Sequence, residues 1–191
     1  MLQIDDAGSG SLIGGTCIGL YLPEHNIFKY DFIPLECYTP ENFKQKKYQK
    51  YVVYIISNFF KELDIPLDEE IQLCQGYIFD FLREYLTLKG YRWNSVKIEG
   101  ALQEKVEKAF ENYAISLGLP QSYISYTKFP FHFHKLLRWV YADYDNRKQF
   151  CKSGWKSWLK YGNLPIKTSY GNMNSSGYFC LKCGKKIKAK S

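Results

Sequence analysis

The segment that decides the fold is Leu2-Gln3-Ile4-Asp5-Asp6-Ala7-Gly8-Ser9-Gly10-Ser11-Leu12-Ile13-Gly14-Gly15. An apolar strand runs into two adjacent carboxylates, a glycine- and serine-rich turn follows, and a second strand leaves over residues 16–21. Two carboxylates at a strand end are costly to hold together unless a cation lies between them. Oxygen ligands of this kind suit Mg²⁺ or Mn²⁺, and the glycines allow another backbone to approach closely. The alternative is a polar hairpin turn with no ligand.

Periodicity and turn signals in the following chain predict an α/β fold. A third antiparallel strand is expected at 27–36, and shorter strands at 70–74 and 95–100. Helices are expected at 39–63, 77–89, 102–117 and 132–150. This order predicts a mixed five-stranded sheet flanked by helices, because helical crossovers join parallel strands. We expect one domain over residues 1–150 and a basic C-terminal extension over residues 151–191.

Two parts of the opening segment resemble known enzymes. Ile4-Asp5-Asp6-Ala7-Gly8-Ser9-Gly10 resembles the opening motif of type 2 ribonucleases H, in which an apolar residue precedes Asp-Glu-Ala-Gly-Arg/Lys-Gly. Gly14-Gly15 and the return strand resemble the first hairpin of type 1 ribonucleases H. The element order is similar to that of the wider ribonuclease H-like superfamily, including RuvC-type resolvases. The resemblance implies a nuclease that hydrolyses phosphodiester bonds with two divalent metals, Mg²⁺ or Mn²⁺, held by three or four acids.

The resemblance assigns Asp5 and Asp6 to the catalytic metal site. Glu99 follows a predicted strand and is a further candidate, although an acid that stabilises the start of the next helix is an equal alternative. The family places its last acid on a C-terminal helix, where Asp143 lies close to the inward line of that helix. Asp145 lies about 200° away on the same helix and is held in reserve as a metal ligand.

One departure from the family pattern weakens the prediction of catalysis. The predicted fourth strand, Ile71-Gln72-Leu73-Cys74-Gln75-Gly76, has no acid at its end. Glu99, Asp80 or Glu36 would have to substitute for it. Otherwise the domain is a non-catalytic nucleic-acid-binding or scaffold module on the same fold. Ser9 replaces the Arg or Lys of the type 2 motif, so specificity for hybrids does not carry over.

The charge of the chain is strongly uneven. The net charge is +7, yet residues 1–150 hold 17 basic and 19 acidic residues, and residues 151–191 hold nine lysines and no acid. A polycationic segment suits a polyanion such as RNA or DNA, and a solubilising tail is the alternative. The candidate nucleic-acid contacts combine lysines and an aromatic ring with Ser9 of the glycine-rich turn: Ser9, Lys152, Trp155, Lys156, Lys160, Lys185 and Lys186. Packing of the tryptophan onto the domain is an alternative.

A Cys-x-x-Cys pair lies near the end of the chain. Cys180 and Cys183, followed by a glycine, resemble one knuckle of a zinc ribbon, which would supply two of four Zn²⁺ ligands. Cys151 is the nearest further cysteine. A redox pair, two free thiols or a zinc- or thiol-based sensor are the alternatives.

Several classes of protein are disfavoured by the sequence. No apolar run reaches the 18–20 or so residues of a membrane helix, and an early aspartate argues against a signal peptide. Six scattered cysteines do not form the disulfide framework of a secreted domain. We therefore expect a cytoplasmic protein. His132 and His134 could position a water or a phosphate, or could be surface or capping residues.

Overall fold

A computed structural model describes residues 1–166, 180, 181, 185 and 187. Its strands form one mixed sheet in the order β3-β2-β1-β4-β5. β1 is antiparallel to β2 and parallel to β4, β2 is antiparallel to β3, and β4 is parallel to β5. The predicted α/β fold is confirmed, and the topology is compatible with a ribonuclease H-like fold. The strands are β1 (Leu2–Ala7), β2 (Thr16–Leu22), β3 (Ile27–Ile33), β4 (Glu70–Cys74) and β5 (Arg92–Val96).

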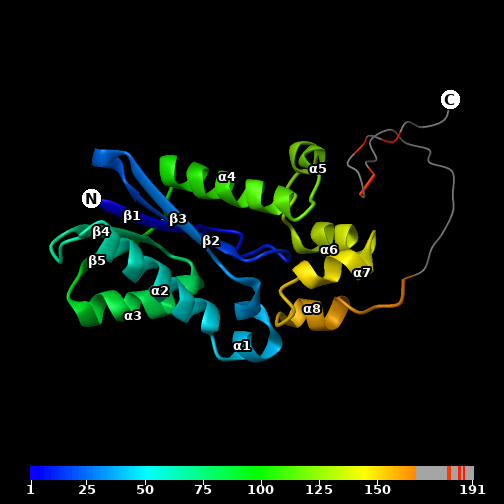
Figure 1. Cartoon of the computed structure of the whole chain (residues 1–191), viewed down its shortest axis with the longest axis horizontal. Helices are drawn as coiled ribbons and strands as arrows, with labels where there is room; N and C mark the ends of the chain where they lie inside the picture. The colour runs from blue at the N-terminus through cyan, green and yellow to red at the C-terminus, as the bar shows by residue number, and fades with distance from the viewer. Residues whose placement is uncertain (167–179, 182–184, 186, 188–191) are drawn as a thin grey trace.

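Helices cover both faces of the sheet (Figure 1). One face packs against α4, and the other packs against α2 and α3. Beyond the sheet lie four short helices and the segments that join them. The helices are α1 (Pro40–Lys44), α2 (Lys47–Glu62), α3 (Asp80–Lys89), α4 (Ala101–Ser116), α5 (Gln121–Tyr126), α6 (Phe133–Tyr141), α7 (Tyr144–Arg147) and α8 (Lys156–Tyr161).

Side chains of β1 alternate between the two faces, as a strand requires. Leu2 and Ile4 are buried in the core under α2 and α3, whereas Ala7 packs in the core under α4. By the same alternation Asp5 belongs to the α4 face and Asp6 to the α2 face. The two carboxylates therefore leave the strand in different directions.

Three predicted elements differ in the structure. The helix expected at 39–63 is divided into α1 and α2 at Lys46, whose backbone is left-handed at φ 53° and ψ 35°. The strand expected at 95–100 lies at Arg92–Val96, because α3 ends at Gly90 in a left-handed conformation and β5 then pairs with β4 from Glu70↔Arg92 onward. The long helix expected at 132–150 breaks after Tyr141. Asp143 leaves the helical conformation there, at φ −156° and ψ 64°, and precedes the four-residue helix α7.

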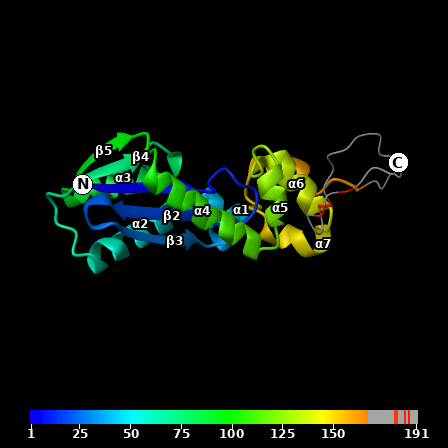
Figure 2. The ribbon, with the colours of Figure 1, turned by 90° about the horizontal axis from the view of Figure 1, so that it is seen from above.

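A second core joins the C-terminal helices to the glycine-rich turn (Figure 2). Leu12 and Ile13 are fully buried among side chains of α4, α5 and α6. Ile13 forms an isolated antiparallel bridge with Cys151, and the backbone N–H of Lys152 donates to the Leu12 carbonyl at 2.8 Å. Cys151 and Lys152, expected to open the basic extension, are thus packed into the body. Much of the remaining extension lies outside the described residues.

Within the described part of the chain, every helix is too short or too polar to cross a lipid bilayer.

Gly19 sets how closely α4 approaches the sheet. A Cβ atom at Gly19 would lie 2.2 Å from Val106 Cγ1 on α4. We expect Gly19→Ala to lower the free energy of unfolding by about 1–3 kcal/mol, because overpacking moves the helix or the strand. Chemical denaturation measures this change. Gly10→Ala is the matched control, since its Cβ would meet no atom within 4 Å. Equal stability of the two variants would contradict this account of the packing.

Candidate metal centre

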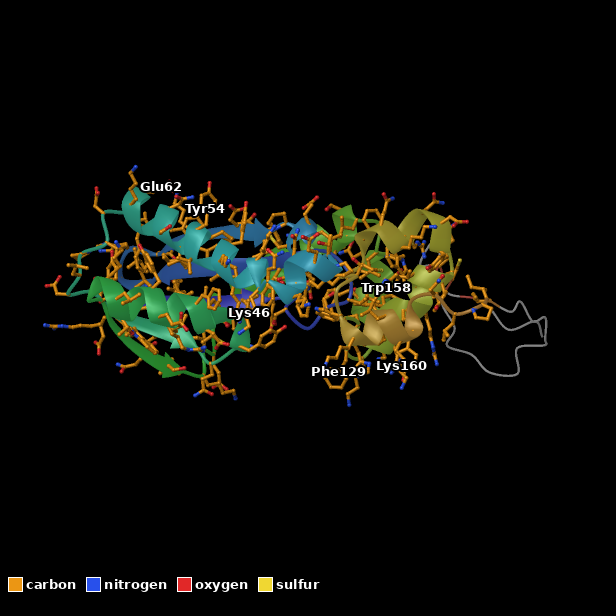
Figure 3. The ribbon with its side chains drawn as sticks, turned by 90° about the horizontal axis from the view of Figure 1, so that it is seen from below. Lys46, Tyr54, Glu62, Phe129, Trp158 and Lys160 are labelled. Atoms are coloured by element: carbon orange, nitrogen blue, oxygen red, sulfur yellow. The ribbon has the colours of Figure 1, made fainter. Side chains whose placement is uncertain are left out.

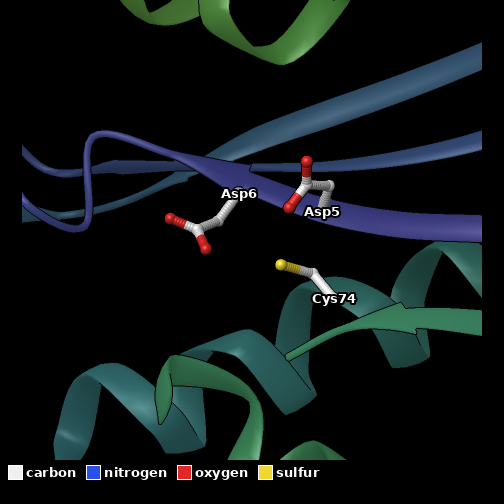
Figure 4. A group of neighbouring side chains, drawn as sticks. All are labelled: Asp5, Asp6 and Cys74. Carbon is white, nitrogen blue, oxygen red and sulfur yellow. The ribbon is translucent and has the colours of Figure 1, made fainter. Parts of the chain in front are cut away.

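Two carboxylates and one thiol converge at one edge of the sheet. One ligand atom each from Asp5, Asp6 and Cys74 lies within 4.8 Å of the others. Figure 4 shows the two aspartates leaving β1 and the thiol of Cys74 reaching toward them from β4. Among the described residues, this is the group of acids, histidines and cysteines whose spacing could hold a metal ion.

The pairing of β1 with β4 creates the cluster. The two strands are parallel, and their paired positions end at Ile4↔Leu73. The next residues, Asp5 and Cys74, therefore lie side by side where the ladder stops. Asp6 follows beyond the last pair, so its side chain reaches the same gap although it leaves β1 on the other face.

Asp5 is held in a largely desolvated position. Its side chain is buried, with 6% of the residue exposed. Burial raises the pKa of the Asp5 carboxyl, and the negative charge of Glu107 on α4 acts in the same direction. The Cys74 thiol and the Asp6 backbone N–H donate hydrogen bonds to this carboxylate and partly offset the rise. Burial, followed by the hydrogen bond to Asp5, raises the pKa of Cys74 to about 12.

Asp6 is the more perturbed of the two acids. Burial raises its pKa to about 6, and the charge of Asp5 adds to that effect. The hydroxyl and backbone N–H of Ser9 donate hydrogen bonds to the Asp6 carboxylate, and the positive charge of Lys152 also favours its ionised form. Lys152 therefore offsets only part of the negative charge of the two aspartates, as is typical of a site that binds a cation.

Lys152 reaches the cluster from the C-terminal part of the chain. It is completely buried, and its Nζ donates to the Gly8 carbonyl at 2.5 Å. The ammonium lies over the rings of Tyr38 and Trp155, 4.8 Å and 5.1 Å from their centroids. Burial lowers the pKa of Lys152 to about 7, although Asp6 opposes that shift. The structure does not place Lys152 on a nucleic-acid-binding surface, as the sequence predicted, but beneath the glycine-rich turn.

An open pocket of about 730 Å³ gives access to the cluster. The cluster and the glycine-rich turn form one side, and α4 forms another with Gln103, Glu107 and Glu111. The loop from Phe129 to His132 forms a third side. The pocket is large enough for a nucleotide-sized group next to the carboxylates.

Three predicted acids lie apart from this cluster. Glu99 is exposed in the loop before α4 and pairs with Lys97. Asp143 precedes α7 and accepts a hydrogen bond from Asn146 Nδ2 at 2.9 Å. Asp145 is exposed and pairs with Lys148 at 3.2 Å. The structure therefore brings together Asp5 and Asp6 of the predicted set, while Asp143 lies at the break between α6 and α7.

The other predicted contacts are scattered. Ser9 lines the pocket, as expected for a residue of the glycine-rich turn. Trp155 is half-buried over Lys152, while Lys156, Lys160 and Lys185 are exposed. Cys180 is half-buried, and its backbone N–H donates to the Lys185 carbonyl at 2.8 Å. Cys183 and Lys186 lie outside the described residues, so the predicted zinc knuckle stays a prediction.

Sequence reasoning missed three groups that surround Asp5. From the sequence, Cys74 marks only the strand end that lacks an acid, and its place beside Asp5 becomes visible through the parallel pairing of β1 with β4. Glu107 and Glu111 are one turn apart on α4 and line the pocket. Glu107 directly follows the buried Val106, and Glu111 directly follows the buried Phe110. Their position at the border of the apolar face of the helix could have indicated from the sequence that they lie near the sheet.

The donor set fits a divalent cation. Two carboxylate oxygens and one thiol match borderline ions such as Co²⁺ or Zn²⁺ better than Mg²⁺, and Mn²⁺, although an oxygen-preferring ion, accepts a sulfur ligand more readily than Mg²⁺ does.

Comparison with known proteins adds no relative. No family model, no curated protein and no solved structure matches the chain.

The raised pKa of Asp6 predicts how stability depends on pH. The pKa of Asp6 in the folded protein, about 6, exceeds the ordinary value of 3.8 for this side chain, so the folded state binds the extra proton between these pH values. The Asp6 contribution to stability is therefore greatest below pH 4 and is lost as pH rises to about 6. Asp6→Asn should remove this loss, so the stability of the variant should stay level between pH 4 and pH 6, where that of the wild type falls by about 1–3 kcal/mol.

Denaturation of both proteins from pH 4 to pH 8 measures this difference. Asp145→Asn, at an exposed position, is the control and should change stability by less than about 0.5 kcal/mol. If Asp6→Asn kept the fall in stability that the wild type shows between pH 4 and pH 6, the assignment of that fall to Asp6 would be contradicted.

Proposed function

We propose that the chain is a divalent-metal-dependent phosphodiesterase of the ribonuclease H-like type, acting on nucleic acid. The observation that carries the proposal is the convergence of Asp5, Asp6 and Cys74 within 4.8 Å at the end of β1. The sheet order β3-β2-β1-β4-β5 and the opening motif support the same assignment.

Asp5, Asp6 and Cys74 would hold the metal ion. A bound divalent ion would polarise a phosphodiester and lower the pKa of a bound water, which is the chemistry that hydrolysis needs. Ser9 keeps the Asp6 carboxylate oriented through two hydrogen bonds. Glu107 and Glu111 bring further negative charge to the pocket wall and would attract a second cation.

Lys152 would act on the site through its charge and through the turn. Its ammonium fixes the Gly8 carbonyl and partly neutralises Asp6 from the side away from solvent. A cation built into the protein lowers the repulsion between the two aspartates before any metal binds. Lys152 is therefore a positioning residue in this proposal.

One observation favours a second function. Cys74 stands where the resembled enzymes have an acid, and the described acids Glu99 and Asp143 do not replace it. A non-catalytic nucleic-acid-binding module on the same fold would need no complete metal site. It would keep the pocket and the exposed lysines Lys156, Lys160 and Lys185.

Cleavage assays separate the two functions. The substrates are a hybrid, a single strand, a duplex and a four-way junction, each tested with Mg²⁺ and with Mn²⁺. We expect metal-dependent cleavage that Asp5→Asn reduces by at least about a thousandfold, because the metal loses a central ligand. Asp143→Asn is the matched control and should retain activity. Binding without cleavage of any substrate would favour the non-catalytic module.

Cys74 should determine which metal is used. We expect the wild type to prefer Mn²⁺ over Mg²⁺, and Cys74→Asp to shift that preference toward Mg²⁺ by on the order of tenfold. Titration of activity and calorimetric binding of each ion measure the ratio. Cys17→Ser, a buried thiol outside the cluster, should leave the ratio unchanged. An unchanged ratio in Cys74→Asp would remove Cys74 from the ligand set.

A further inference from the structure

Phe129 occupies an unusual place on the wall of the pocket. Its side chain is 69% exposed, and Figure 3 shows it projecting outward at the edge of the molecule. Its backbone is left-handed, with φ +56°. This conformation is costly for a bulky residue, and such strain concentrates at functional sites. Neither burial nor backbone preference therefore explains a phenylalanine at this position.

The wall that carries Phe129 is firmly supported. Phe131, two residues later, contacts the ring of Phe110 edge to face at 5.0 Å between centroids. Phe110 in turn packs directly beneath Gly8, where a Cβ atom would lie 2.2 Å from its ring. Aromatic packing thus connects the glycine-rich turn of the metal cluster to the loop that presents Phe129.

The charges around the pocket suit a nucleotide. The carboxylates line it together with Lys97, which also pairs with Glu99. Lys128, the neighbour of Phe129 in the chain, places its Nζ 5.2 Å from the centroid of the Phe129 ring. In a nucleotide, a base lies close to a phosphate, so an aromatic ring that stacks on the base and an ammonium group that contacts the phosphate would bind it together.

We propose that Phe129 stacks on an unpaired nucleobase next to the phosphodiester held at the metal cluster. This inference rests on the proposed function and narrows its substrate to DNA or RNA with unpaired nucleotides at the cleavage site. In an intact duplex both faces of a base are covered by its neighbours. An unpaired base offers a free face, and stacking then replaces the exposure of the Phe129 ring to water.

Binding assays on defined oligonucleotides test the proposal. The probes are a duplex with one unpaired nucleotide, the same duplex with an abasic site at that nucleotide, and the fully paired duplex. Fluorescence anisotropy with Ca²⁺ in place of a catalytic metal reports affinity alone. We expect Phe129→Ala to weaken binding of the first probe about 5- to 100-fold. Binding of the other two probes should change less than about twofold, because neither offers a base to stack.

Two further variants exclude a purely structural explanation. Phe129→Gly removes the ring and accepts the left-handed backbone, so it should melt at a higher temperature than the wild type and still lose affinity like Phe129→Ala. Phe129→Trp should bind the unpaired probe at least as tightly as the wild type. An equal loss of affinity for all three probes, or no loss for any, would overturn the stacking role. Absence of binding by the wild type to every probe would instead overturn the proposed function.

Discussion

The hydrogen bond from buried Lys152 to the Gly8 carbonyl is the interaction on which the arrangement of the site depends. It joins the C-terminal helices to the turn that follows β1. Two backbone contacts strengthen the same junction, from the N–H of Lys152 to the Leu12 carbonyl and from the N–H of Gly14 to the Phe150 carbonyl. Because a buried ammonium needs both a partner and a counter-charge, this lysine stabilises the fold only where the turn and Asp6 are correctly placed.

Strain from like charges is the second constraint. Burial raises the pKa values of both Asp5 and Asp6; the charge of Glu107 further raises the pKa of Asp5, and the charge of Asp5 further raises that of Asp6. A protein selected for stability alone would replace one of them with a neutral side chain. The hydrogen bonds from Ser9 and the charge of Lys152 reduce the repulsion without removing it. A cation placed between the two carboxylates would relieve the remaining repulsion, and this relief would favour its binding.

The sequence was a good guide where periodicity and local turn chemistry decide the structure. It predicted the mixed sheet, the helices that flank it and the two aspartates that precede the glycine-rich turn. It could not predict the break after Tyr141, because the apolar pattern continues through that point and only the conformation of Asp143 ends the helix. Nor could it place Lys152, since a lysine in a basic segment is normally solvated and its burial depends on contacts with residues more than a hundred positions away.

The residue type at position 74 determines the chemistry of the cluster, whereas the pairing of the strands determines where that residue lies. The parallel pairing of β4 with β1 determines that the residue after Leu73 lies beside Asp5, whatever its type. An acid there would add a third negative charge to a desolvated pair and would raise the repulsion further. A neutral thiol avoids that repulsion in the metal-free protein, and it still offers a soft donor once a metal displaces its proton. A cysteine at this position therefore gives less charge repulsion than a third carboxylate, and in the proposed metal site it would favour ions that accept sulfur.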